Sequence, residues 1–249
     1  MKLRFSSFGL GFGLLMWSLG ALASPDNWLQ LGEFGWANSN QTWLNTTLSA
    51  GFGLNQKLHY GLMWSNGTRY GQSSLEARSS LTYAPTRQER GFLVLGGGYG
   101  AWVPHLQVRL GWDQALGQGS LHLLMGFSEY AQTRLEEWGV GQSWYWGNWR
   151  AYVQGAALRQ EGGAGAFWLW GAQGGLVRYF GGNSLSLLGG EGVSATGSMR
   201  QPLAQSWNVA LVWRERLSRH WEVFPVLRVQ HLAKQPLFWG AGLALQYQF

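Results

Sequence analysis

The sequence contains no cysteine and few charged residues, which make up 12% of its 249 positions. The absence of cysteine excludes disulfide bonds, thiolate metal sites and cysteine nucleophiles. Lysine is also scarce, because 15 of the 18 basic residues are arginine. These arginines are scattered singly, so the net charge of +6 forms no basic patch of the kind that binds nucleic acid.

A long apolar segment is missing from the chain after Ser24. No stretch there approaches the roughly 20 consecutive apolar residues that a membrane-spanning helix needs. The longest candidate, GFLVLGGGYGAWV at 91–103, is interrupted by glycines. A membrane protein with this sequence must therefore cross with strands, and strands in lipid satisfy all their backbone groups only in a closed barrel.

The first residues have the pattern of a secretory signal. Two basic residues precede an apolar run, and the small-residue motif of Ala21, Leu22 and Ala23 follows it. We expect a signal peptide over 1–23 that is cleaved, and a single domain over 24–249, because the composition does not change along the rest of the chain. A single transmembrane anchor is the alternative interpretation of the first segment.

The last thirteen residues, LFWGAGLALQYQF, alternate with a period of two. One face is aromatic at its ends and aliphatic in the middle, and the other is mostly small or amide-bearing. A strand that faces lipid on one side and a wet lumen on the other has this pattern. We expect the terminal Phe249 to be an assembly signal, recognised by the machinery that inserts outer-membrane barrels.

The same alternation, with turn signals between segments, recurs along the whole chain. The expected strands are 28–36, 42–53, 56–65, 73–84, 90–99, 104–115, 119–129, 134–145, 148–159, 166–179, 184–196, 205–216, 221–233 and 237–249. The predicted fold is all-β, an antiparallel up-and-down transmembrane barrel of about fourteen strands, with twelve as the alternative. An even number places both termini on the periplasmic side, so the loops near 65–72, 129–134, 160–166, 197–204 and 234–236 should be extracellular.

Charged residues within these strands indicate which face is the lumen. An arginine directed towards lipid near the midplane costs about 2–4 kcal/mol, so the arginine-bearing side should face inward. The lumen candidates are Glu76, Arg78, Arg109, Asp113, Arg150, Arg214, Glu222 and Arg228. One interpretation of their basic excess is a conduit for anionic or saccharide solutes. The alternative is a set of ion pairs that only fills a structural or partner-binding barrel.

Catalytic and metal sites have little support in the sequence. Ser218, His220 and Glu222 alternate near one end of a strand, and this suggests a Ser-His-acid triad in a membrane-embedded lipid hydrolase. A polar periplasmic turn, in which such residues are common, accounts for them better, and we predict no enzyme. The five histidines lack metal-ligand spacing, so neither a metal nor another cofactor is expected.

The chain resembles the YaiO family of outer-membrane β-barrel proteins. The resemblance rests on RYGQSSLEARSSLTY at 69–83, Pro104, DQALGQG at 113–119, VGQSWYWGNWRAYV at 140–153 and VRYFGGNS at 177–184. It implies an integral barrel in the bacterial outer membrane, in contact with lipid and lipopolysaccharide and without catalytic residues. Similar barrels form the membrane parts of exopolysaccharide exporters, so an accessory role in surface polysaccharide export is a further hypothesis.

Overall fold

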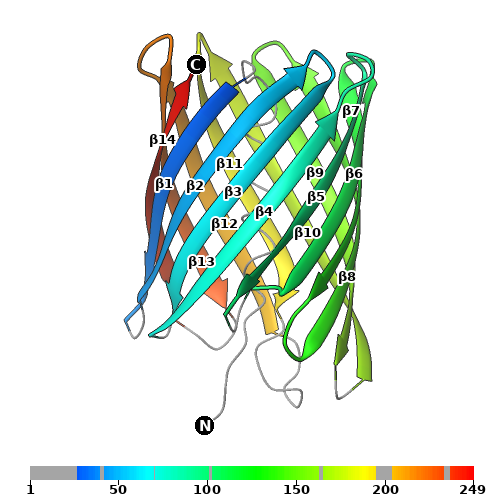
Figure 1. The fold of residues 1–249 in the computed structure, drawn as a ribbon, viewed down its shortest axis with the longest axis vertical. Helices are drawn as coiled ribbons and strands as arrows, with labels where there is room; N and C mark the ends of the chain where they lie inside the picture. Colours follow the sequence, from blue (N-terminus) through cyan, green and yellow to red (C-terminus); the bar gives the residue numbers. More distant parts are fainter. Residues whose placement is uncertain are drawn as a thin grey trace.

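The structure, a computed structural model, describes residues 27–39, 42–69, 71–100, 103–162, 165–194, 204–232 and 236–249. Within them, fourteen antiparallel strands close into one barrel (Figure 1). They are β1 (Asn27–Ala37), β2 (Thr42–Asn55), β3 (Leu58–Arg69), β4 (Gln72–Tyr83), β5 (Glu89–Tyr99), β6 (Leu106–Leu116), β7 (Gly119–Glu129), β8 (Thr133–Trp146), β9 (Trp149–Gly162), β10 (Gly165–Phe180), β11 (Asn183–Ser194), β12 (Ala204–Arg216), β13 (Trp221–Leu232) and β14 (Phe238–Gln248). The predicted fourteen-strand barrel is confirmed, and the twelve-strand alternative is wrong. The expected signal over 1–23 lies outside the described residues.

The barrel closes where the first strand pairs with the last. The antiparallel register of β1 and β14 runs from Trp28 opposite Gln248 to Ala37 opposite Trp239. The C-terminus lies beside the start of β1 in Figure 1, and the backbone N–H of Phe249 donates to the carbonyl of Asn27 at 3.1 Å. Every strand therefore has a partner on both sides.

Short turns join the strands at the barrel end that holds Asn27 and Phe249. Two residues connect β2 to β3, β6 to β7, β8 to β9 and β10 to β11. Gly117, Gly147 and Gly181 occupy three of these turns with φ of 60°, 52° and 61°, a conformation that favours glycine in tight hairpins. Tight turns beside the termini are typical of the periplasmic end of outer-membrane barrels. We therefore take the opposite end as extracellular.

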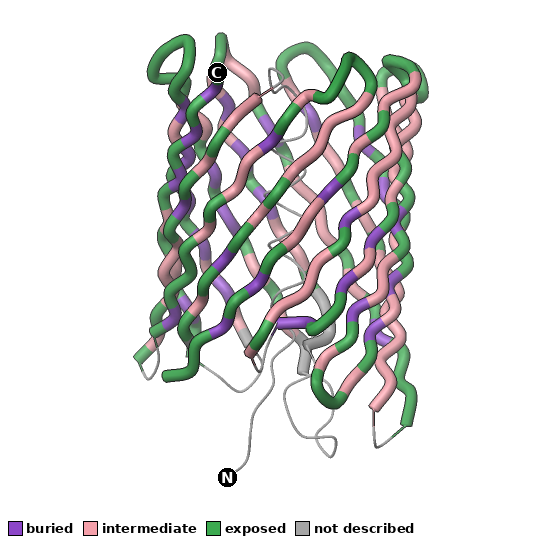
Figure 2. Tube along the Cα trace, in the orientation of Figure 1, coloured by how far each residue is buried: buried purple, intermediate pink, exposed green. Residues whose placement is uncertain are grey.

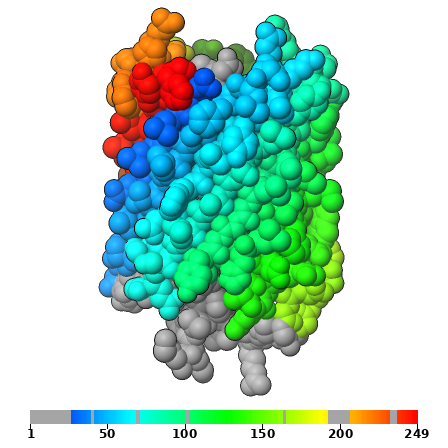
Figure 3. All heavy atoms as spheres, in the orientation of Figure 1, coloured from blue at the N-terminus to red at the C-terminus, as the bar shows by residue number. Residues whose placement is uncertain are grey.

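Burial alternates along the strands, as Figure 2 shows by the change of colour along the tube. On β14 the side chains of Phe238, Ala244 and Gln246 are buried, whereas those of Leu243 and Leu245 are exposed. The exposed residues are the predicted lipid-facing set. Because the barrel is closed, the buried side chains point into its interior and the exposed ones form the continuous outer wall seen in Figure 3.

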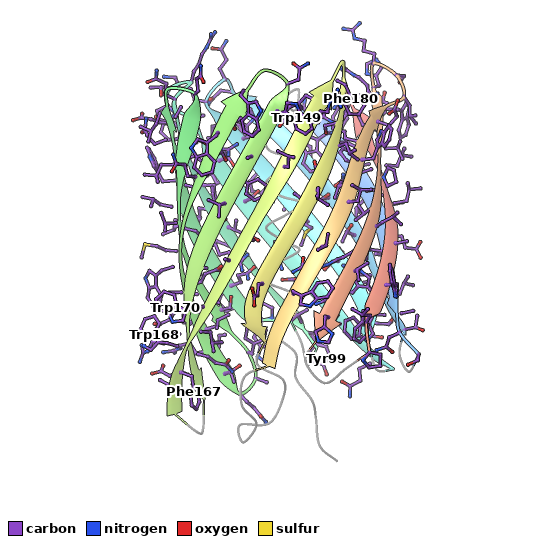
Figure 4. The ribbon with its side chains drawn as sticks, turned by 180° about the vertical axis from the view of Figure 1, so that it is seen from behind. Tyr99, Trp149, Phe167, Trp168, Trp170 and Phe180 are labelled. Atoms are coloured by element: carbon purple, nitrogen blue, oxygen red, sulfur yellow. The ribbon has the colours of Figure 1, made fainter. Side chains whose placement is uncertain are left out.

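Aromatic residues gather near both ends of the outer wall. Figure 4 shows Trp149 and Phe180 near the periplasmic end, and Trp168, Trp170 and Tyr99 near the opposite end. Trp168 is 55% exposed and Trp170 68% exposed. Two such belts flanking an aliphatic band match the interfaces and hydrocarbon core of a bilayer.

Inward aromatic rings pack across the closing seam. Phe34 and Trp36 on β1 contact each other edge to face at 4.9 Å between ring centroids. They lie against Gly240 and Gly242 of β14, where an added Cβ would come within 1.8 Å of Trp36 and 2.0 Å of Phe34. The two glycines therefore make the space that the rings occupy.

Replacing Gly242 with alanine should weaken the closed barrel, because the methyl group would overlap the Phe34 ring and displace it. We expect about 1–3 kcal/mol of destabilisation, which is the usual cost of overpacking. Urea unfolding followed by tryptophan fluorescence measures the change. Gly155→Ala is the matched control, since no atom lies within 4 Å of its added Cβ. Equal stabilities of the two variants would contradict the packing described for the seam.

Deleting Phe249 should lower the amount of folded protein in the outer membrane. Its ring is 59% exposed on the lipid-facing side and stacks on Tyr247 at 6.2 Å between ring centroids. The expected loss follows from the predicted role of this ring as the signal that assembly machinery recognises. The amount of heat-modifiable barrel in membrane fractions is the measurement, with Leu217→Ala as a control for an exposed apolar residue in a turn. An unchanged yield would refute the assembly role.

Candidate functional site in the barrel interior

The eight predicted lumen residues all lie on the inward faces of their strands. Glu76, Arg109, Arg150, Glu222 and Arg228 are buried, with exposed fractions between 2% and 7%. The remaining three, Arg78, Asp113 and Arg214, are partly buried and engage in ion pairs. The structure brings these residues together in three groups.

The first group joins β4, β6 and β8. Arg78 and Glu76 form an ion pair of 2.7 Å, and Arg109 and Glu137 form one of 3.2 Å. Arg109, Gly126 and Glu137 are directly opposed on three successive strands. Gly126 has no side chain, so the Arg109 guanidinium crosses β7 to reach the carboxylate two strands away.

Glu137 was not among the predicted lumen residues. The signal was present in the sequence, because consecutive glutamates at 136 and 137 in a strand must face opposite sides. Tyr130, in the connection after β7, lies close to this group, and burial raises the pKa of its phenol. The phenol is therefore neutral and adds no charge beside Arg109.

The second group is a hydrogen-bonded chain across β5 to β9, near the periplasmic end. Arg90 pairs with Asp113. Nδ1 of His122 lies 2.7 Å from the Asp113 carboxylate, and Nε2 lies 2.8 Å from Oγ of Ser143. Arg150 donates to the same Ser143 oxygen at 3.1 Å. Sequence reasoning missed Arg90, His122 and Ser143, since only the register of five strands brings them together.

The order of Asp113, His122 and Ser143 is that of a hydrolase triad. Ser143, however, has an exposed fraction of 0%, so no substrate carbonyl can reach its oxygen. It lies within a strand paired on both sides, where backbone N–H groups are used in the sheet and provide no oxyanion hole. The arrangement supports a polar network in the barrel wall and gives no geometric support to nucleophilic catalysis.

Arg150 differs from the other arginines of the first two groups. Among the described residues, no carboxylate forms an ion pair with it. Its guanidinium lies over the rings of Tyr145 and Tyr152, at 5.6 Å and 5.5 Å from their centroids. Its Nε is buried without a hydrogen-bond partner in the described part of the chain. The network therefore ends in an uncompensated positive charge that faces the interior.

The third group lies on β12, β13 and β1. Arg214 binds Glu222 through two hydrogen bonds of 2.9 Å and 2.7 Å. The guanidinium of Arg228 crosses Gly240 of β14 and lies 5.1 Å from the ring centroid of Trp36. Both carboxylate oxygens of Glu222 accept hydrogen bonds from Arg214, so Glu222 is not available to orient a catalytic histidine.

The structure also separates the members of the triad suggested by the sequence. Nδ1 of His220 lies 2.9 Å from the Gln248 carbonyl. The Ser218 hydroxyl oxygen accepts hydrogen bonds from two backbone N–H groups of the same turn. The donor nitrogens are those of His220, at 3.3 Å, and Trp221, at 3.2 Å. Ser218 and His220 are therefore both in contact with backbone groups, of the turn and of Gln248 respectively.

The described residues contain no group of three or more His, Cys, Asp and Glu side chains that could hold a metal ion. No helix in the described part of the chain is long and apolar enough to cross a membrane.

Comparisons with known proteins find a likeness of structure at low sequence identity. No protein-family model and no curated protein matches the sequence. The chain is similar in structure to an anion-selective porin from Comamonas acidovorans, with 9% identity, a TM-score of 0.53, and coverage of 90% of this chain and 98% of the porin. A bacterial polysaccharide outer membrane secretin is similar with 7% identity, a TM-score of 0.60, and coverage of 91% and 99%. The translocator domain of the autotransporter NalP from Neisseria meningitidis shares 11% identity, a TM-score of 0.51, and coverage of 96% and 94%.

The chain is a bacterial outer-membrane β-barrel. Its closed sheet, aliphatic outer band and aromatic belts provide the physical basis, and the solved barrels share its fold. At these identities the likeness extends to the fold alone, so the YaiO resemblance stays a prediction.

The pair of Arg109 and Glu137 should behave as a coupled unit in the outer-membrane barrel. Arg109→Leu or Glu137→Leu alone leaves a charge in a poorly solvated interior and should cost about 3 kcal/mol of unfolding free energy. The double variant removes both charges, so it should be more stable than either single variant. Urea titrations of the three variants measure the coupling.

The exposed pair of Arg159 and Glu136 provides the comparison, with 35% and 28% of the two side chains exposed. The two single leucine variants and the double variant of this pair should give a coupling free energy below about 1 kcal/mol. Similar coupling at both sites would mean that the interior around Arg109 is as well solvated as the rim.

Proposed function

We propose that the barrel is a conduit for anionic solutes across the outer membrane, with sugar acids as a fitting class. The observation that carries the proposal is Arg150, an inward guanidinium with no ion-pairing carboxylate among the described residues. Inward charge of one sign concentrates solutes of the opposite sign within a pore. The paired arginines contribute less to the field.

An arginine that is paired with a carboxylate should contribute less to ion selectivity than an arginine without one. Arg109 is balanced by Glu137, and Arg214 by Glu222. Their fields largely cancel beyond the pair, so they act mainly as parts of the wall. Arg150 sits among polar and aromatic groups that suit a sugar acid, since guanidinium binds carboxylate and tyrosine rings stack on sugar faces.

The finer proposals rest on resemblance. The sequence resembles the YaiO family, and two barrels of similar fold are described as an anion-selective porin and a polysaccharide outer membrane secretin. These names are compatible with traffic of anionic or saccharide material, including an accessory role in polysaccharide export. We also propose contacts with lipopolysaccharide at the outer belt and with the assembly machinery at Phe249.

The conduit is tested by conductance in planar bilayers. Wild-type protein should pass current with a preference for anions over cations. The preference should fall as salt shortens the Debye length from about 10 Å at 0.1 M to about 3 Å at 1 M. Arg150→Gln should reduce the anion preference, and Arg150→Glu should abolish or invert it, because the uncompensated charge is removed or reversed.

Arg178→Gln is the matched control. Its guanidinium is on the outer wall, 5.3 Å from the Trp149 ring centroid, so its removal changes the net charge by the same amount without affecting the interior. Heat-modifiability verifies that each variant is folded. A folded wild type without current would sink the conduit and favour the structural or partner-binding barrel. An equal change in selectivity with Arg178→Gln would remove Arg150 from the explanation.

A further inference from the structure

A carboxylate stands on the lipid-facing side of the barrel wall. Glu33 is exposed. It lies on the same face of β1 as Leu29 and Leu31, which are 46% and 57% exposed, because alternate residues of a strand share one face. The residues before and after it, Gly32 and Phe34, lie on the other face of the strand and point inward. Glu33 therefore points away from the interior that holds the other charged groups.

The strand register places Glu33 midway between the two aromatic belts. It is directly opposite Leu243 of β14. Leu243 lies four residues from Tyr247, near the periplasmic end, and four from Trp239, on the extracellular side. Four residues of strand span roughly 13 Å, and this exceeds the reach of a glutamate side chain. The carboxylate cannot reach either interface along its own strand.

Glu33 belongs to a row of polar side chains that crosses three strands. It is opposite Thr46 of β2, and Thr46 is opposite Asn66 of β3. Both are exposed and outward-facing. Two residues nearer the periplasmic end, the corresponding row consists of Leu31, Leu48 and Trp64, as lipid contact requires. The change from apolar to polar occurs within the membrane band.

The polar row has no partner within the described part of the chain. None of the described residues forms an ion pair or side-chain hydrogen bond with Glu33. Ionisable groups that face hydrocarbon are costly and usually mark a functional contact. A contact from outside the barrel would supply what the fold does not.

We propose that this face of β1 to β3 is the contact surface for a second copy of the chain in the membrane. The row contains an acceptor-rich carboxylate together with a hydroxyl and an amide, both of which donate hydrogen bonds. A two-fold axis that passes beside Thr46 brings the β1 side of one copy to the β3 side of the other. Each Glu33 then meets the donor-bearing side of its partner, and the same contact is made twice.

Small residues beside Glu33 leave room on the outer wall between the larger side chains of Leu44 on β2 and Trp239 on β14. Gly35 and Ala241 are directly opposed on the extracellular side of Glu33, followed by Ala37 on the same strand. Small residues at this position permit close backbone approach, which is how membrane segments associate without a hydrophobic driving force. The outer face of β1 to β3, blue to cyan, faces the viewer in Figure 3.

Mass measurement in lipid nanodiscs tests the proposal. Wild-type protein and Glu33→Gln, which keeps hydrogen-bonding capacity, should be dimeric. Glu33→Leu should lower the dimer fraction by about tenfold or more, because it removes the interaction and makes the monomer wall compatible with lipid. The leucine variant also removes a charge from the lipid face, so it should fold at least as well, as heat-modifiability checks.

The absence of cysteine allows the surface to be located directly. Thr46→Cys should yield a covalent dimer when membranes are oxidised or treated with a short bismaleimide. Leu211→Cys, on the outer face of β12, is the control and should not. A monomeric wild type in nanodiscs, an unchanged dimer in Glu33→Leu, or equal cross-linking at both positions would overturn the proposal. Cross-linking of Thr46→Cys only to another membrane protein would also overturn it, in favour of a different partner.

Discussion

The pairing of β1 with β14 is the contact on which the rest of the structure depends. In hydrocarbon, an unpaired backbone N–H or C=O has no water to replace its lost partner, so a sheet with free edges is not viable. Ten directly opposed residue pairs, from Trp28 and Gln248 to Ala37 and Trp239, remove both edges at once. The strict alternation of the strands follows from this closure, because it gives every strand one lipid-facing and one interior side.

Closure also determines how the interior is built. Inward side chains on neighbouring strands are too close for large groups to stand side by side on every strand, and glycine provides the space. Arg109 reaches Glu137 across Gly126, and Arg228 reaches Trp36 across Gly240. The abundance of glycine, 38 residues in all, is therefore a packing requirement as well as a turn requirement.

The fold could be predicted from the sequence because its signals are local. Alternation with a period of two, turn residues and the cost of charge in lipid act within single strands, and they indicated the fourteen strands and the inward side of each predicted lumen residue. The pairing partners could not be predicted in the same way. Asp113 bonds to His122, and His122 to Ser143, because of the relative register of β6, β7 and β8. A shift of two residues in any one of these strands would have given a different network from the same faces.

An uncompensated charge needs a partner on either side of the barrel wall, but the partners available in the interior differ from those available in the lipid. Inside, most charges among the described residues meet an opposite charge or an aromatic ring. Arg150 lies over two tyrosine rings but forms no ion pair with a described carboxylate, and anionic solutes are its proposed partners. Outside, Glu33 faces hydrocarbon, where neither water nor solute is available to it. An uncompensated charge in the interior can be stabilised by whatever enters the barrel, so it favours selectivity. An uncompensated charge on the lipid face can be stabilised only by another protein or a lipid headgroup, and its distance from both belts excludes the headgroup. The medium that each side of the wall faces, more than the charge itself, therefore separates a residue that selects solutes from one that selects a protein neighbour.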